Sequence, residues 1–211
     1  MFQNPQPHKH FFVGGNYKTT LSTLLLRQNT MDIQTKYIDK FKSEQTFVDI
    51  YTDNYDDSDY GFIMDFNEDF LLLEKFNSDC FYDGVTIFIR ENITRIRWGG
   101  NEITSASKFI DSSQRQQSKI SVDLTSIQTI LQTVQDSYEH VTVHIQDIDK
   151  DVCFIGQIHE MDSEYLVIYE YGTKISLDRK FVLIALDNIT RVDAGGHYER
   201  NLEKLFVGQK K

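Results

Sequence analysis

Short segments with the polar and apolar pattern of β-strands recur along the chain. In some of them apolar residues alternate with polar ones, and in others they form short runs between polar residues. A period of two is typical of a strand with one buried face, and a short apolar run is typical of a buried strand. These patterns predict strands at 47–50, 70–73, 85–89, 93–98, 141–145, 166–169 and 181–186.

A helical period precedes each group of strands. One apolar stripe predicts a helix from Asp123 to Glu139, with Asp123 as its N-cap. A weaker stripe between Ile33 and Phe41 predicts a helix ahead of the first group, and Leu21–Leu26 belongs either to that helix or to a separate element. The stripe of the later helix comprises Leu124, Ile127, Ile130, Leu131, Val134 and Tyr138.

The chain contains an internal repeat. The segment 92–96, Asn-Ile-Thr-Arg-Ile, returns at 188–192 as Asn-Ile-Thr-Arg-Val, and a Gly-Gly pair follows each copy. Collinear matches of this kind favour a duplication over chance. Earlier matches lie in the same order: 61–65 with 156–160, 70–74 with 165–169 and, weakly, 47–50 with 142–145.

The repeat predicts the fold class and the domains. About five short strands per copy, joined by tight connections, favour small barrels over open sheets. We therefore expect a mainly β protein with helices, made of two tandem five-stranded barrels that each follow a helix. The Ser- and Gln-rich stretch 104–118 is typical of a linker, so the expected domains are 1–103 and 119–211.

Each copy resembles the Sm-like fold of the Sm, Lsm and Hfq proteins. Segment 89–96, Ile-Arg-Glu-Asn-Ile-Thr-Arg-Ile, is similar to the family's second motif, with Glu91 in place of a Gly. The resemblance implies two tandem Sm-like barrels, and another small barrel of the SH3-like kind is the alternative. The first motif is matched by Gly61, Ile63 and Phe66, with Asn67 in place of an Asp, and in the second copy by Gly156, Ile158, Met161 and Asp162.

The residues that contact RNA in this family are mostly replaced. In Sm-like rings a loop Asn and a second-motif Arg hold a base, but Leu71 and Leu166 stand at the two Asn positions and Leu186 at one Arg position. Of these four positions only Arg90 matches the family. The candidate RNA contacts are Arg90, Arg95 and Arg97.

Charge also disfavours RNA. The chain has a net charge of −10, and residues 47–102 carry 13 acidic and four basic residues. Such a surface repels phosphate. We therefore expect a protein partner, with a second copy of this chain among the options. Sm-like barrels pair their fourth strand with the fifth strand of a neighbour, so two barrels in one chain permit one such pairing internally, and we expect a monomer or a small oligomer.

Acidic segments before Gly61 and Gly156 are the candidate metal sites. The spacing of the second segment, Asp-x-Asp-x-Asp, is that of the start of a calcium loop. Val152 and Ile158 stand where such a loop needs Gly and Glu, and a solvated turn is the alternative. The candidate ligands are Asp53, Asp57, Asp59, Asp147, Asp149 and Asp151.

No catalytic motif stands out. The sequence has no nucleophile elbow, phosphate-binding loop or dinucleotide fingerprint, and Cys80 and Cys153 lack the paired spacing of a zinc site. We expect no enzyme and no cofactor. Trp98, the only tryptophan, is either an exposed anchor for a partner or a ring that caps the core.

We therefore expect a non-enzymatic Sm-like protein that acts in protein assembly or partner binding. An RNA-binding protein and a metal-dependent enzyme or metal-binding module are the alternatives. The polar N-terminus lacks the layout of a signal peptide, and no apolar run reaches the length of a membrane span. We accordingly expect a cytoplasmic protein without membrane contacts.

Overall fold

A computed structural model of the chain describes residues 32–52, 58–111, 113, 115, 121–173 and 178–207. This part is mainly β, with ten antiparallel strands in one sheet and four α-helices, which confirms the coarse fold class. Leu21–Leu26 lies outside the described residues. The described residues from Tyr37 onward form one compact unit. No described helix is both long and apolar enough to cross a bilayer.

Both copies of the repeat have the same order of elements. The first comprises α1 (Ile33–Glu44), β1 (Phe47–Thr52), β2 (Asp59–Phe66), β3 (Phe70–Phe76), β4 (Tyr82–Ile89), β5 (Ile93–Trp98) and α2 (Gly100–Ser107). The second comprises α3 (Ile127–Tyr138), β6 (Val141–His144), β7 (Cys153–Met161), β8 (Tyr165–Glu170), β9 (Lys180–Ala185), β10 (Arg191–Ala194) and α4 (His197–Val207).

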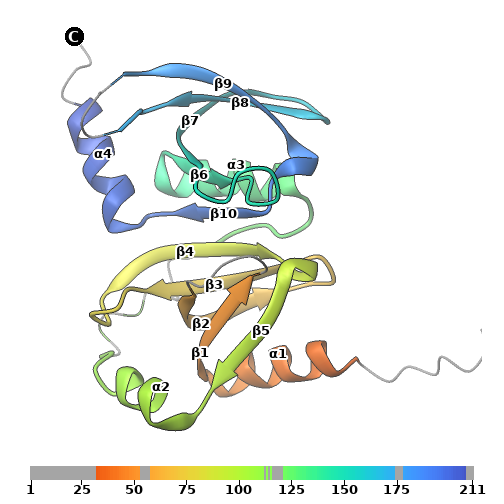
Figure 1. Ribbon diagram of the computed structural model, residues 1–211, viewed down its shortest axis with the longest axis vertical. Helices are drawn as coiled ribbons and strands as arrows, with labels where there is room; N and C mark the ends of the chain where they lie inside the picture. The colour runs from red at the N-terminus through yellow and green to blue at the C-terminus, as the bar shows by residue number, and fades with distance from the viewer. Residues whose placement is uncertain are drawn as a thin grey trace, which may run out of the picture. The chain divides into compact units, whose positions relative to one another are not determined.

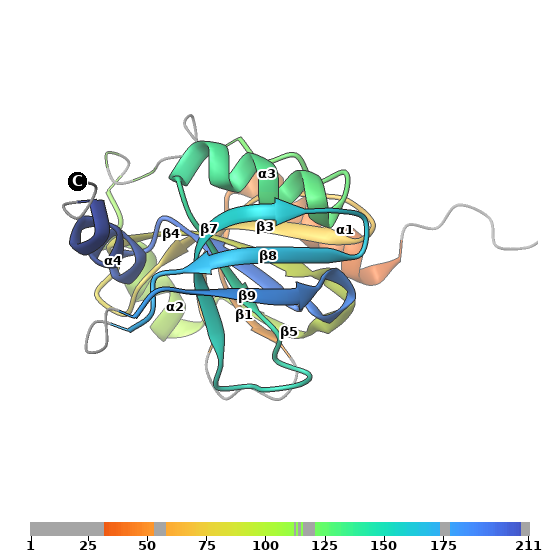
Figure 2. The same ribbon diagram turned by 90° about the horizontal axis from the view of Figure 1, so that it is seen from above.

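The strand order also repeats. The sheet runs β5-β1-β2-β3-β4-β10-β6-β7-β8-β9, so the fifth strand of each copy lies beside the first strand of that copy. Strands β4 and β10 pair where the copies meet, as Figure 1 shows. This is the internal pairing that the sequence permits. Seen from above, β7, β8 and β9 follow one another at the other end of the second copy (Figure 2).

Strand pairing corrects one part of the repeat alignment. Val48 lies opposite Gly61 and Val141 lies opposite Gly156, so Val48 corresponds to Val141. The weak sequence match of 47–50 with 142–145 was therefore wrong by two residues. The connection between the first two strands is two residues longer in the second copy. A shift of two residues leaves each side chain on the same face of the sheet. The alternation of polar and apolar residues therefore could not reveal the error.

Alternate residues of β3 and β4 enter two different apolar clusters. Leu71, Leu73 and Phe88 pack with Ile38 and Phe41 of α1. Their neighbours on the opposite face pack with α3 and with the strands of the second copy, so this cluster spans the junction between β4 and β10. Those neighbours are Phe70, Leu72, Val85 and Ile87.

A glycine allows the two copies to approach closely. Gly84 of β4 has a φ of +91°, and a Cβ at this position would lie 2.1 Å from the carbonyl oxygen of Ala194. No other residue type tolerates both the backbone angle and the contact. The junction therefore depends on direct backbone contact as well as on apolar packing.

Helix α3 begins three residues later than the sequence suggests. Ser126, rather than Asp123, is its N-cap, and Ser126 and Thr129 form a capping box. The carboxylate of Asp123 instead accepts a hydrogen bond from the backbone N–H of Thr125 at 2.9 Å. Asp123 therefore closes a turn before the helix. Aspartate is as common in such turns as it is at N-caps.

The first residues of the predicted linker 104–118 belong to helix α2, which extends to Ser107. Further along, Arg115 forms an ion pair with the buried Glu74 and donates a hydrogen bond to Gln45 at 2.7 Å. The guanidinium also lies 3.7 Å from the centre of the Phe62 ring. This stretch is thus anchored to the first copy at Arg115, while the division into domains 1–103 and 119–211 stays a prediction.

Candidate protein-binding site

The two end strands of the sheet, β5 and β9, are the places where a partner strand can add. Among the described residues, β5 has a strand neighbour only on its β1 side. Such an edge presents backbone N–H and C=O groups that can pair with another chain. Trp98 ends β5 and is 48% exposed, which is high for a tryptophan.

The Trp98 ring is held by aromatic contacts with α1. Its centre lies 4.9 Å from that of Phe41 and 5.4 Å from that of Tyr37. After Trp98 the chain turns sharply into α2 through Gly99, which has a φ of 67°. A Cβ at Gly99 would meet no atom within 4 Å, so the glycine serves the backbone angle rather than a close contact. One face of the ring is thus fixed while the rest stays exposed.

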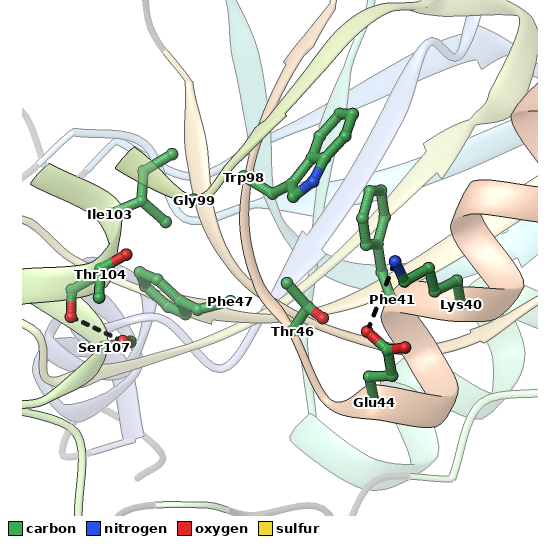
Figure 3. A pocket seen from close by; sticks show the side chains of 10 residues that line it. All are labelled: Lys40, Phe41, Glu44, Thr46, Phe47, Trp98, Gly99, Ile103, Thr104 and Ser107. Atoms are coloured by element: carbon green, nitrogen blue, oxygen red, sulfur yellow. Dashed lines mark hydrogen bonds and ion pairs between the residues drawn. The ribbon is translucent and has the colours of Figure 1, made fainter. Parts of the chain in front are cut away.

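A cavity of about 230 Å³ lies beside Trp98, between α1, the start of β1 and α2. Figure 3 shows Trp98 next to Phe41 and, across the cavity, Phe47 and Ile103. The ion pair of Lys40 with Glu44, at 4.0 Å, lies at its α1 side. The lining residues are Lys40, Phe41, Glu44, Thr46, Phe47, Trp98, Gly99, Ile103, Thr104 and Ser107.

A second, shallower hollow of about 430 Å³ shares Trp98, Gly99 and Ile103 with the first. Arg97, Asn101 and Glu102 supply its polar lining. The tryptophan therefore lines two hollows, and both combine apolar or aromatic residues with charged ones. An apolar centre with a polar rim is the usual layout of a protein-binding patch.

The arginines of β5 are already engaged with their own copy. Arg97 donates hydrogen bonds to the buried carboxylate of Asp49, at 2.6 Å from Nε. This hydrogen bond raises the pKa of Arg97 above its usual value. Arg95 stacks on Tyr51, with its guanidinium 3.7 Å from the ring centre. Both side chains are fixed in orientation while part of each remains exposed.

Arg90, the family-like RNA position, is buried. Its Nη1 donates to the carbonyl oxygen of Asn67, and its guanidinium lies 5.7 Å from the centre of the Phe66 ring. Asn67 in turn donates from Nδ2 to the Leu124 carbonyl at 2.6 Å. Arg90 therefore holds the turn between β2 and β3 against the segment before α3.

An acidic cavity of about 510 Å³ lies near this turn. Five of its nine lining residues are apolar, four are acidic, and none is basic. This arrangement repels phosphate groups. The lining residues are Glu68, Asp69, Phe70, Ile89, Glu91, Ile127, Leu186, Asp187 and Ile189.

The candidate metal ligands fall in three parts of the sequence. Asp53 and Asp57 lie outside the described residues. Asp147, Asp149 and Asp151 lie exposed in the connection between β6 and β7. In the described ranges, no group of three His, Cys, Asp or Glu side chains is placed to hold a metal ion. Asp59 is buried in an ion-pair network, described next.

Sequence reasoning missed a buried charge network at the junction. Asp59 binds Lys75 at 2.7 Å and Arg191 at 3.1 Å. Asp193 lies 3.9 Å from Lys75, 3.3 Å from Arg191 and 3.0 Å from His144. The Asp59–Arg191 contact spans 132 residues of sequence, so no local motif reveals it. The network ties β2 and β3 of the first copy to β10 and β6 of the second.

The pKa shifts in this network have clear causes. Burial raises the pKa of Asp193, but Arg191, Lys75 and His144 outweigh that effect and hold it well below its usual value. Burial lowers the pKa of Lys75, and the carboxylates of Asp193 and Asp59 more than reverse this shift. Burial and Arg191 lower the pKa of His144. The imidazole is therefore neutral at pH 7, whereas Asp193 and Lys75 are charged.

The network contains a thiol neighbour but no activated nucleophile. Cys153 lies directly opposite His144 on the adjacent strand. Both ring nitrogens of His144 lie within 3.4 Å of Arg191 Nη2, and Nε2 also contacts Asp193. Desolvation and Asp193 raise the pKa of the Cys153 thiol. A catalytic cysteine needs a lowered thiol pKa, so this arrangement is suited to structure rather than to catalysis.

Comparisons with protein-family models, with curated proteins and with solved structures found no match. The functional argument therefore depends on the geometry of this chain. That geometry offers an exposed aromatic site around Trp98, at the end of the edge strand β5.

Proposed function

We propose that the chain consists of two tandem Sm-like barrels and acts, without catalysis, as a protein-binding module in assembly. Three observations support the barrels: each copy has five strands, its fifth strand lies beside its first, and a helix precedes it. A short sheet that returns to its own first strand leaves few free edges.

Trp98 carries the functional part of the proposal. It is a half-exposed tryptophan at the end of an edge strand, lining two hollows, with its ring orientation fixed by Phe41. A rigid aromatic ring loses little entropy on binding, and such rings dominate the energetics of protein interfaces.

Three features favour a protein over RNA as the partner. Arg90 is buried, Arg97 is paired with Asp49, and the cavity at the β2–β3 turn is acidic. An RNA-binding surface needs exposed cations that track phosphates. A protein partner instead gains from the apolar ring and from the edge of β5 that faces no other strand of the described residues.

Photo-crosslinking tests this proposal. A photo-reactive residue in place of Asn101 lies in the hollow beside Trp98, and the same residue in place of the exposed Ile148 is the matched control. We expect a protein adduct from position 101 in native cells, reduced about tenfold by Trp98→Ala because the anchor is lost.

An adduct to RNA, or equal adducts from positions 101 and 148, would contradict the proposal. A melting temperature that rises with added calcium or manganese would favour the metal-binding alternative instead.

A further inference from the structure

Strands β8 and β9 expose an apolar face. On this face Tyr165, Phe181 and Leu183 are 44%, 58% and 64% exposed. The two strands are antiparallel, so residues opposite each other point to the same side of the sheet. Contiguous exposed apolar side chains of this kind mark a binding surface. The β8–β9 face, as we call it, consists of Tyr165, Val167, Tyr169, Phe181, Leu183 and Ala185.

The internal repeat identifies the matching face of the first copy. Phe70 corresponds to Tyr165, and these two residues lie opposite Ile89 and Ala185 in the adjacent strands. Strand β4 therefore corresponds to β9 with an offset of 96. The matching face is covered, because each of its apolar residues is 8% exposed or less. These residues are Phe70, Leu72, Val85 and Ile87.

Helix α3 forms part of this cover, and contacts at both of its ends define its direction. At its start, Ile127 lines the same cavity as Phe70 and Ile89. At its end, the hydroxyl oxygen of Tyr138 lies 3.4 Å from that of Tyr82. Since Tyr82 begins β4 and Ile89 ends it, α3 runs along β4 in the opposite direction. The apolar stripe of α3 belongs to the same cluster as the covered face.

Helix α4 leaves the β8–β9 face open. It packs at one end of the second copy, where the rings of Phe206 and Tyr171 stack with their centres 5.2 Å apart. Phe181 and Leu183 stay more than half exposed. In the described part of the chain, the place that α3 takes on the first copy is thus open on the second.

Lys180 favours a helix over a strand as the occupant of this place. Inside the chain, β10 approaches β4 so closely that a Cβ at Gly84 would lie 2.1 Å from the carbonyl oxygen of Ala194. Lys180 stands at the position of Gly84 in the second copy, so a strand cannot come as near there. A helix packs on the side chains of a sheet face and needs no such backbone approach.

Charges at the two ends of the β8–β9 face suit a helix that runs along β9 as α3 runs along β4. The end at Ala185, where such a helix begins, carries the exposed carboxylates of Glu164 and Asp187. The other end carries Lys180, which pairs with Glu170 at 3.4 Å and remains largely exposed. Because a helix is positive at its N-terminus and negative at its C-terminus, this distribution of charge attracts it in that direction.

One polar group distinguishes the two faces. In the first copy, Asn67 donates from Nδ2 to the carbonyl oxygen of Leu124, just before α3. Its counterpart in the second copy is Asp162. Backbone N–H groups of Glu164 and Tyr165 donate to the Asp162 carboxylate and lower its pKa. A carboxylate has no hydrogen to donate, so a helix that fits here presents a cation rather than a carbonyl group before its first turn.

We propose that the β8–β9 face binds an amphipathic helix of a partner protein. The helix places an aliphatic stripe on Phe181 and Leu183, and a lysine or arginine just before its first turn pairs with Asp162. A helix of 12 residues, the length of α3, spans about 18 Å, and the six residues of β9 span about 20 Å. The inference goes beyond the proposed function, because it assigns a second surface on the other copy from Trp98.

A synthetic helix derived from this chain is the probe. It comprises residues 124–138, because this segment carries the stripe that covers the first copy. A hydrocarbon staple between positions 128 and 132 holds it helical, and Thr125→Lys supplies the cation for Asp162. Fluorescence anisotropy measures its binding to the purified full chain.

We expect saturable binding of this probe, weakened about tenfold or more by Leu183→Asp, because the substitution places a charge in an apolar contact. Leu183 is exposed, so the variant should remain folded. Ile148→Asp, at another exposed position, is the matched control and should bind as the wild type does. Equal affinity of the wild type and Leu183→Asp would overturn the inference.

The charge before the first turn tests the direction of the helix. A probe with Thr125→Glu should bind about fivefold more weakly than the probe with Thr125→Lys, because the glutamate meets Asp162 and Glu164. Asp162→Asn in the full chain should reduce this difference. Asparagine at the same place in the first copy accepts the corresponding backbone N–H groups, so the turn is retained. Equal affinity of the two probes for the wild type would overturn the proposed direction.

Two further results would overturn the inference. One is the absence of saturable binding up to about 1 mM probe. The other is self-association of the chain that Leu183→Asp abolishes in sedimentation, because a second copy then covers the face. The proposed function is tested separately: Trp98→Ala should leave probe binding unchanged, and Leu183→Asp should leave the cross-link from position 101 unchanged. Loss of probe binding in Trp98→Ala would show that the two surfaces are not distinct.

Discussion

The fifth strands of the two copies, β5 and β10, correspond in sequence but lie in different surroundings. β10 is enclosed between β4 and β6, whereas β5 has a strand neighbour only on its β1 side in the described part of the chain. At the last position of the strand, β10 carries the fully buried Ala194 and β5 carries the half-exposed Trp98. One position earlier, β10 has a buried Asp193 and β5 has an exposed Arg97. After duplication, one copy of the strand thus has residues suited to a permanent junction and the other has residues suited to an open edge.

Strands β4 and β9, the fourth strands of the two copies, differ in the same way. β4 presents buried Val85 and Ile87, and β9 presents exposed Phe181 and Leu183. The apolar character is retained at both places, although only one of them is covered by the described chain. Exposure without loss of apolar character is what a binding edge requires, and it is the feature that the predictions below examine.

The largest effect is expected from Asp193→Ala, which removes the shared acceptor of Lys75, Arg191 and His144. Lys75 and Arg191 keep their ion pairs with Asp59 but lose this second carboxylate, so we expect a loss of about 3–5 kcal/mol in the free energy of unfolding. Urea denaturation measures it. Asp187→Ala, at an exposed position in the same copy, is the control and should change stability by less than about 0.5 kcal/mol. Similar losses in both variants would show that the junction network contributes no special stability.

A smaller loss of stability should distinguish a substitution in β4 from the corresponding substitution in β9. Ile87→Ala leaves a cavity in the cluster that spans the junction, and we expect it to cost about 2–4 kcal/mol. Leu183→Ala at the counterpart position should cost less than about 1 kcal/mol in dilute protein, because Leu183 is exposed there. Thermal or urea unfolding at low concentration gives both values. Equal losses would mean that the β9 face is already covered in a single chain.

Several elements could be predicted from the sequence because their signals are local, whereas helices α2 and α4 were not predicted. The stripe from Leu124 to Tyr138 predicted α3, and the alternation at 93–98 predicted β5. The start of α3 was missed because Asp123 and Ser126 both suit an N-cap, and only hydrogen-bond geometry separates them. The repeat predicted equal strand content in the two copies, and the structure has five strands in each.

The charge network could not be predicted from the sequence. Asp59 was singled out as a metal ligand because acidic residues precede Gly61, but its partners Lys75 and Arg191 come from distant strands. Arg90 was singled out from a motif that says nothing of burial. Trp98 was suggested as either an exposed anchor or a ring that caps the core, and in the structure its ring packs on Phe41 while it remains half exposed. Its role as an anchor stays a prediction.

The smallest expected effect concerns the pH dependence of stability, at a position where one copy has a titratable residue and the other does not. His140 of the second copy corresponds to Phe47 of the first, because Val141 corresponds to Val48. Burial, with a contribution from Arg200, lowers the pKa of His140 to about 4. Between pH 6.5 and that value the unfolded chain binds a proton that the folded chain does not, so stability must fall as the pH falls. From pH 6.5 to pH 5 we expect a loss of about 2 kcal/mol from this residue.

His140→Gln isolates this contribution, because glutamine does not titrate and can still accept the hydrogen bond that Gly195 N–H donates to His140 Nε2 at 3.2 Å. Urea denaturation at pH 6.5 and pH 5 should show a smaller pH dependence in the variant than in the wild type. Glu199, whose pKa is raised by burial, acts in the opposite direction and is common to both proteins, so it cancels in the difference. The first copy, with Phe47 at this place, has no such group. An unchanged pH dependence in His140→Gln would show that His140 has the same pKa in the folded and the unfolded chain, and the two copies would then be alike in their response to acid at this position.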